Sequence, residues 1–191
     1  MNKKIRWITE TAVMLALLVT LQALTKPMGQ LVTGSFVNAV LAVAVLVAGL
    51  YSGVTVALIS PVLAYLLGIA PMPLTVPAIM VGNTVYVVVL HFLTGKDSRK
   101  VTRRVIAWAV AAAAKFAALY AIVVWLICGV LSEQLLSSGA MKAPMLKALP
   151  ATFSWPQLFT ALIGGAVALA IVPVLRKALR KNKILLFDIC K

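Results

Sequence analysis

Six apolar segments fill most of this chain and leave only short polar connections between them. A hydrocarbon core roughly 30 Å thick is crossed by about 20 helical residues, so 191 residues hold six crossings and no separate soluble domain. Only 12% of the residues are charged, where a soluble domain has about 25%. We expect an all-α integral membrane protein, a single transmembrane domain over 1–191 with spans at about 7–24, 36–50, 54–69, 76–93, 105–131 and 157–175.

The basic residues predict the orientation of these spans. Cytoplasmic loops of membrane proteins retain Lys and Arg. With the amino terminus inside, 14 of the 18 Lys and Arg residues lie on the cytoplasmic side and three on the outer side. We therefore expect both termini in the cytoplasm, and an uncleaved first helix because no small-x-small cleavage site follows the basic start. Since the positive charges lie between apolar runs and not on a solvated face, the net charge of +14 does not indicate nucleic-acid binding.

Proline, glycine and polar residues predict where the spans break. Tyr51-Ser52-Gly53 predicts a tight turn between the second and third spans, and Ser60-Pro61 predicts an interruption of the third. Residues 132–156 form an amphipathic connector before the sixth span.

Lys115 is the most unusual residue, because a lysine deep in a membrane helix costs at least about 2.5–3.5 kcal/mol and usually pairs or lines a cavity. It has three interpretations. The side chain pairs with Glu10, the one acidic residue embedded in a span; it reaches toward the cytoplasmic interface; or it meets an anionic substrate group or a partner protein.

Polar residues inside other spans are expected to bond to neighbouring helices, since an unpaired amide in an apolar environment is costly. Asn38 is assigned to such interhelical contacts. Asn83, in the segment Gly82-Asn83-Thr84-Val85-Tyr86, is also a candidate ligand contact because its depth places it in the outer half.

Further polar and aromatic residues gather at the outer ends of the spans. Trp125 and Trp155 fit either an aromatic belt or a binding site. His91, the only histidine, has no second ligand at helical spacing and does not indicate a metal site. The candidate substrate-binding residues are Gln30, Asn83, Tyr86, Lys115, Tyr120, Trp125, Trp155, Gln157 and Thr160.

Catalytic motifs are missing. The sequence has no phosphate loop of the type Gly-x-x-x-x-Gly-Lys-Ser/Thr, no His-Glu-x-x-His, no Gly-x-Ser-x-Gly and no pair of embedded carboxylates. We therefore expect no enzyme, no catalytic residues and no cofactor. The function class that remains is recognition or passage of a solute.

The first span carries Thr11-Ala12-Val13-Met14-Leu15-Ala16, and the Ala-x-x-x-Ala spacing puts two small residues on one helix face, where another helix can approach closely. A basic start precedes this motif, and an outer loop with Pro27, then Asn38-Ala39-Val40 and Ala48-Gly49-Leu50-Tyr51-Ser52-Gly53 follow it. This series, with six spans in under 200 residues, resembles the S components of energy-coupling factor (ECF) transporters, the substrate-binding subunits for vitamins and related micronutrients. The motif part covers about the first 95 residues.

The resemblance implies a multi-pass subunit of a bacterial-type plasma membrane that captures a water-soluble solute from outside. It implies that Ala12 and Ala16 contact a transmembrane T component, which connects to two ATPases. The ligand pocket would lie near the outer surface, and the subunit would tip within the membrane to carry its ligand inward.

The solute is not specified by the resemblance, although Lys26 and Lys115 favour a carboxylate or a phosphate. Two other classes fit the composition. One is a self-sufficient facilitator or channel with the 132–156 connector as its gate, and the other is an assembly subunit without a ligand.

Overall fold

The computed structural model describes residues 3–69, 72–95 and 101–181, and almost all of them are helical. The long helices are α1 (Lys3–Thr25), α2 (Gln30–Val43), α3 (Leu50–Leu66), α4 (Thr75–Thr94), α5 (Val101–Leu119) and α8 (Trp155–Lys181). Two π-helical segments, Ala44–Ala48 and Tyr120–Val130, continue α2 and α5. The short helices are a 3-10 turn at Lys26–Met28, α6 (Ser132–Ser137) and α7 (Ala143–Phe153).

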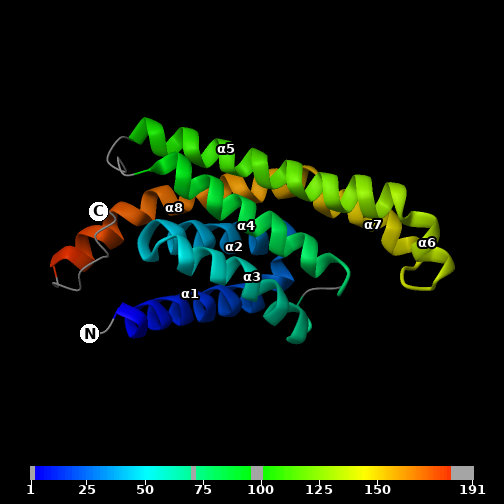
Figure 1. The fold of residues 1–191 in the computed structure, drawn as a ribbon, viewed down its shortest axis with the longest axis horizontal. Helices are drawn as coiled ribbons and strands as arrows, with labels where there is room; N and C mark the ends of the chain where they lie inside the picture. Colours follow the sequence, from blue (N-terminus) through cyan, green and yellow to red (C-terminus); the bar gives the residue numbers. More distant parts are fainter. Residues whose placement is uncertain (1–2, 70–71, 96–100, 182–191) are drawn as a thin grey trace.

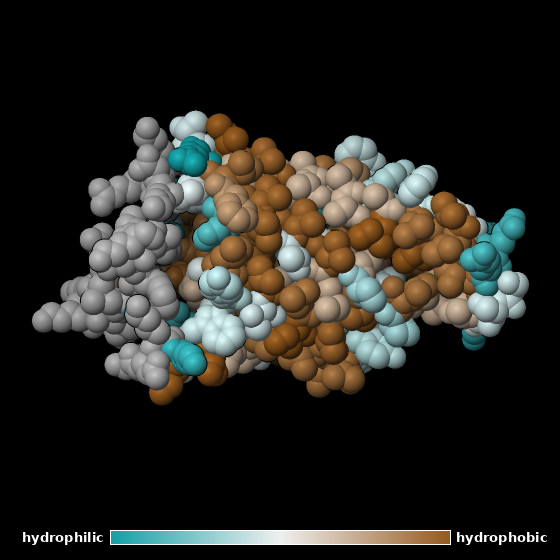
Figure 2. All heavy atoms as spheres, viewed as in Figure 1, coloured by the Kyte–Doolittle hydropathy of each residue, from teal (hydrophilic) through white to brown (hydrophobic). Residues whose placement is uncertain are grey.

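The predicted fold class, a six-span all-α membrane protein, is confirmed. Five helical stretches are long and apolar enough to cross a bilayer: Lys4–Met28, Gln30–Ala48, Thr75–Thr94, Val101–Val130 and Ala143–Leu179. The 17-residue apolar helix α3 is the sixth. Figure 2 shows a broad apolar band across the middle of the molecule, with hydrophilic side chains near its two ends.

α1 begins and α8 ends at the same end of the bundle, opposite α6 and the tip of α7 (Figure 1). Basic side chains bond to helix ends there, because free carbonyls at helix C-termini accept hydrogen bonds from cations. Arg103 Nε donates to Leu93 O at 2.8 Å, and Arg176 Nη2 donates to Leu46 O at 2.6 Å. Other basic residues predicted for this side fall outside the described residues: Lys96, Arg99, Lys100, Lys183 and Lys191.

The predicted turn at Tyr51-Ser52-Gly53 is wrong. The chain reverses at Gly49, which adopts a φ of +94° that favours glycine, and α3 begins at the next residue. Gly53 lies inside α3. A Cβ there would come within 2.8 Å of side-chain atoms of Val45 and Val87, so the role of this glycine is close packing. Pro61 does not interrupt α3 either, since the helix continues to Leu66.

α8 approaches α2 and α5 closely through two consecutive glycines. A Cβ at Gly164 would lie 2.3 Å from Ser35 O, and one at Gly165 would lie 1.9 Å from Trp108 Cδ1. Small residues at such contacts are the usual means by which membrane helices pack. The close approach brings the polar residues of α2, α5 and α8 within hydrogen-bonding distance of one another.

The apolar side chains form two clusters. The larger joins α1–α5 and α8 around Leu18, Leu41, Val56 and Tyr86. The smaller joins the start of α4, the π-helical segment Tyr120–Val130 and α6–α7 around Leu119, Met141 and Phe153. The smaller cluster lies toward the end of the bundle away from the start of α1 (Figure 1).

Candidate functional site

Lys115 is buried in the bundle, with 3% of its surface exposed. Its ammonium donates to Asn38 Oδ1 at 2.6 Å and to Asn83 Oδ1 at 2.7 Å. It also lies 5.7 Å from the centroid of the Tyr86 ring, within the range of a cation–π contact. Three helices, α2, α4 and α5, thus meet at one positive charge.

These three residues occupy equivalent depths. Asn38 is the ninth of 19 residues in Gln30–Ala48, Asn83 the ninth of 20 in α4, and Lys115 the fifteenth of 30 in Val101–Val130. The ammonium is therefore near the middle of the membrane, where a charged group is most costly and requires polar partners.

The amide of Asn38 is fully used. Its oxygen accepts from Lys115, and its nitrogen donates to Gly34 O at 2.8 Å and to Thr160 Oγ1 at 3.2 Å. A lysine only donates hydrogen bonds, so the amide oxygen must face it. Asn38 consequently connects α2 to α5 and α8.

Asn83 and Tyr86 are less completely paired. Both are buried, with 1% and 0% of their surface exposed, and they lie three residues apart on one face of α4. Asn83 Nδ2 and the Tyr86 hydroxyl have no hydrogen-bond partner among the described residues. Buried polar groups are normally bonded, so each of these two calls for an explanation.

A line of hydrogen bonds leads from Asn38 toward α7. Thr160 Oγ1 donates to Gln157 O at 3.1 Å, and Gln157 Nε2 donates to Thr152 O at 3.3 Å. Asn38 bonds to Thr160 at the other end of the line. The polar contacts of Lys115 thus extend through the start of α8 to the end of α7. We call Lys115, Asn38, Asn83, Tyr86 and Thr160 the mid-membrane cluster.

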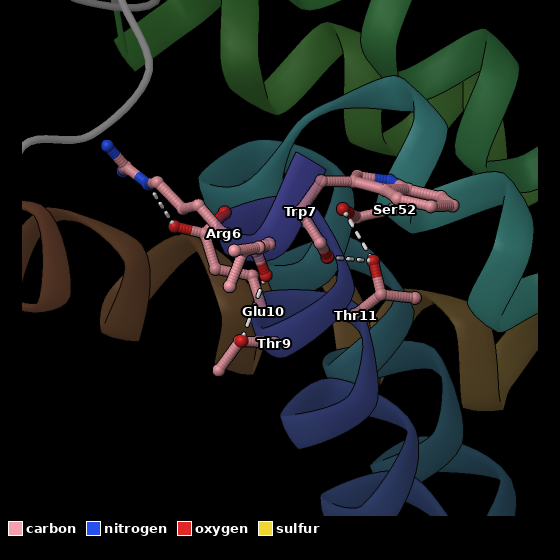
Figure 3. A network of polar contacts seen from close by, with 7 residues as sticks. Arg6, Trp7, Thr9, Glu10, Thr11 and Ser52 are labelled. Carbon is pink, nitrogen blue, oxygen red and sulfur yellow. Dashed lines mark hydrogen bonds and ion pairs between the residues drawn. The ribbon is translucent and has the colours of Figure 1, made fainter. Parts of the chain in front are cut away.

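Pairing of Lys115 with Glu10 is wrong, and so is its extension to the cytoplasmic interface. Glu10 Oε1 accepts from Arg6 Nε at 2.8 Å, one helical turn away on α1 (Figure 3). Depth separates the two residues. By helical rise Glu10 lies about 10 Å from the start of α1, while Lys115 lies about 21 Å from the start of α5.

The remaining predicted ligand residues divide into two groups. Gln157 and Thr160 are buried with the cluster, at 6% and 0% exposure. The structure does not bring the others to the cluster, and they are exposed on the outside of the bundle: Gln30, Tyr120, Trp125 and Trp155. Two of these share a neighbour, because Phe116 stacks on Trp155 at 5.6 Å and lies 5.8 Å from Tyr120.

Sequence reasoning assigned Asn38 to interhelical contacts only, and it missed the role of Gly164. Asn38 was detectable as a polar residue in an apolar run, like Asn83. The Gly164-Gly165 pair in the sixth span was a visible signal for close helix packing.

Two cavities lie elsewhere. One, of about 640 Å³, is lined by residues of α4 and α5 near the basic end, including Phe92, Arg103 and Ile106. The other, of about 270 Å³, is an apolar groove between α2 and α8 around Phe36 and Ile163. None of the predicted ligand residues lines either cavity. Within the described ranges, no three His, Cys, Asp or Glu side chains come together to hold a metal ion.

α1 contributes no side chain to the hydrogen bonds of the mid-membrane cluster. Thr11 attaches it to α3, because Thr11 Oγ1 lies 2.9 Å from Ser52 Oγ (Figure 3). On the opposite side Ala12 and Ala16 are exposed, together with Val13 and Leu17. α1 therefore presents a small, apolar face to its surroundings.

A comparison with protein families identifies a chain with this architecture. The family described as ECF transporter, substrate-specific component, matches residues 6–176, nearly the whole chain. The chain belongs to this family. No curated protein and no solved structure is significantly similar to it.

As an ECF substrate-specific component, the protein is a multi-pass membrane subunit of a transporter. The match spans all the membrane helices, from the second turn of α1 to the basic end of α8. The family implies a small-molecule substrate and membrane partners of the T and ATPase types.

Proposed function

We propose that this protein is the substrate-binding subunit of an ECF-type ABC transporter in a bacterial-type plasma membrane. It captures a water-soluble vitamin or related micronutrient from outside for ATP-driven uptake with a T component and two ATPases. The observation that carries the proposal is the family match over residues 6–176. The subunit recognises and delivers a solute and catalyses no reaction.

The buried polar residues support a binding role. A helix bundle of this kind gains nothing from an isolated mid-membrane charge unless the charge has a partner or a function. Lys115 together with Asn83 and Tyr86 offers polar groups that the described residues do not fully pair. We assign these residues, with Gln157 and Thr160, to the ligand. Four exposed outer residues are assigned to its approach: Gln30, Tyr120, Trp125 and Trp155.

The exposed face of α1 supports a partner role. Only 17% of the most apolar stretch of α1 is buried, the lowest share of the five long spans. Ala12 and Ala16 lie on this exposed face at one-turn spacing, which allows a second helix to pack closely. We propose that this face docks onto the T component.

Reconstitution tests the function directly. Proteoliposomes containing this chain alone should accumulate no vitamin, whereas those containing the chain with a T component and two ATPases should take one up when ATP is supplied. Solute flux through the chain alone would identify a self-sufficient facilitator instead. A chain that shows no solute binding and no solute flux would be an assembly subunit instead.

A matched pair of variants tests the docking face. Ala12→Trp with Ala16→Trp should abolish ATP-driven uptake while leaving solute binding intact, because two indoles on this face block a close helix contact. α5 has an equally spaced pair of exposed alanines, Ala113 and Ala117. The same substitutions there should leave uptake near the wild-type rate. Loss of uptake only in the α5 variant would move the docking face to α5.

A further inference from the structure

We propose that the transported molecule carries a carboxylate, and that this group binds in the mid-membrane cluster at Lys115, Asn83 and Tyr86. This inference rests on the proposed function and names the chemical class of its ligand. It is drawn from the charge of the cluster and from the hydrogen-bonding groups that the cluster leaves available.

The cluster carries a positive charge that no acidic side chain among the described residues neutralises. The two hydrogen-bond acceptors at the Lys115 ammonium are both neutral amides. Of the two acidic residues in the described part of the chain, Glu10 pairs with Arg6, and Glu133 is exposed in α6. Buried charges are normally paired, so a group of opposite charge is expected to come from the ligand.

The available groups can all donate to an anion. Two amide oxygens occupy two of the three ammonium protons, and the third has no acceptor among the described residues. Asn83 Nδ2 belongs to the same amide group that accepts from Lys115, so it lies within a few ångströms of the ammonium. The Tyr86 hydroxyl has no partner within the described ranges, and the ammonium lies beside its ring, so this O–H can also donate to the ligand.

The two asparagines differ in a way that locates the site. Asn38 uses both its oxygen and its nitrogen within the protein, and it therefore fixes the ammonium. Among the described residues, Asn83 bonds only through its oxygen. The ligand is therefore expected on the α4 side of Lys115, between Asn83 and Tyr86, and not on the α2 side.

Charge balance favours a carboxylate over a phosphate. A phosphate monoester carries about −1.5 to −2 charges at pH 7, so a single ammonium would leave excess negative charge in the membrane core. A carboxylate has one charge and two oxygens, which matches one ammonium and two neutral donors. Phosphate sites also usually contain arginine, and no arginine contacts the described part of this cluster.

Binding to the purified full-length protein in detergent tests this inference. The probes are three carboxylic acids, nicotinate, pantothenate and biotin, each compared with its uncharged partner, nicotinamide, panthenol or biotinamide. Riboflavin, thiamine and pyridoxal phosphate complete the panel. We expect calorimetry to show that at least one acid binds. It should bind at least about 100-fold more tightly than its uncharged partner, because the uncharged partner cannot make the charge-assisted contact with the buried ammonium.

Variants assign this preference to the cluster. Lys115→Met should reduce the ratio of acid to uncharged-partner affinity to near one. Should that variant fail to fold, Asn83→Asp decides, since its own carboxylate would occupy the place next to the ammonium. It should lower acid binding at least 100-fold while raising the melting temperature of the protein without ligand, a combination that loss of folding does not produce.

Tyr86→Phe removes only the hydroxyl and should weaken acid binding by about tenfold without lowering the melting temperature. The control Tyr65→Phe, on the partly exposed face of α3, should have no effect. An unchanged preference for the acid in both Lys115→Met and Asn83→Asp would show that Lys115 only holds helices together, and would overturn the inference.

The panel separates failure of this inference from failure of the proposed function. Binding of riboflavin or thiamine alone would keep the protein as a vitamin-binding subunit and overturn the carboxylate. Binding of pyridoxal phosphate alone would replace the carboxylate by a phosphate. Binding of no acid overturns the carboxylate, and the uptake measurement then decides the proposed function independently.

Discussion

α1 and the span Gln30–Ala48 are consecutive membrane helices, but only the second lies inside the bundle. In its most apolar stretch 56% of the residues are buried, compared with 17% in α1. Every residue from Asn38 to Ala48 is buried, which is expected of a helix enclosed by protein on all sides. α2 packs on α1 and α8 and also contacts α4, whereas α1 packs mainly on α2 and α3.

The polar residues of these two helices reflect the difference. Asn38 in α2 bonds to side chains of α5 and α8. In α1, Thr9 bonds only to the carbonyl one turn earlier on its own helix, while Thr11, on the inner side, reaches Ser52 of α3 (Figure 3). An enclosed helix therefore uses its polar side chains to fix its neighbours, and a peripheral helix has a face free for partners. Four substitutions measure this contrast.

The largest effect is expected for Asn38→Leu. The change removes an acceptor from a buried ammonium and should lower the free energy of unfolding by about 3 kcal/mol, since hydrogen bonds to charged groups are worth about 1.5–3 kcal/mol and the charge loses a partner. Denaturation in mixed micelles measures it. Thr9→Val on α1 is the control and should change stability by less than about 0.5 kcal/mol. Equal effects at the two positions would remove the distinction between the helices.

Gly164→Ala should destabilise by about 1–3 kcal/mol, because its methyl group would press on the backbone of α2 at Ser35. Gly129→Ala provides a matched control, since a Cβ there meets only one atom at an ordinary 3.7 Å. The difference between the two melting temperatures is the measurement. A tolerated Gly164→Ala would mean that α2 and α8 are less tightly packed than the structure shows.

Thr11→Val should cost about 1 kcal/mol, because it removes the hydrogen bond between α1 and α3 and leaves the Ser52 hydroxyl buried. Thr55→Val on α3 removes an exposed hydroxyl that bonds only to its own helix and should have little effect. If the two variants unfold alike, the contact between α1 and α3 does not depend on this bond.

The smallest effect is expected for the double substitution Ala12→Leu with Ala16→Leu. Both side chains are exposed, so the stability of the isolated protein should change by less than about 0.5 kcal/mol. A chemical denaturation curve checks this, with Ala113→Leu and Ala117→Leu on α5 as the comparison. A large loss would show that this face of α1 packs within the protein and is not available to a partner.

Residue type was informative about which positions matter, but not about how they pair. Lys115 and Asn83 were conspicuous because each is polar within a long apolar run. Glu10 was one candidate partner for Lys115, since opposite charges attract. The structure pairs Lys115 with two amides because α5 packs on α4 and α8, while α1 packs on the far side of α2.

The outer aromatic residues show a second limit. Trp125 and Trp155 were compatible with a belt or a binding site, and in the structure they are 66% and 64% exposed. Periodicity alone did not separate exposed from enclosed faces, since most spans are apolar all round. Which face is enclosed depends on the neighbouring helix.

The sequence by itself determined the number of spans and their approximate positions, because hydrocarbon thickness fixes the length of a crossing. From the basic residues it also predicts their orientation. It also marked the polar residues that such an environment penalises. Only the tertiary structure decided which of these residues meet, because the contact between α2 and α8 depends on close approach at Gly34 and Gly164, and the contact between α4 and α5 on close approach at Gly82. That approach follows from packing in three dimensions, which hydropathy along one chain does not encode.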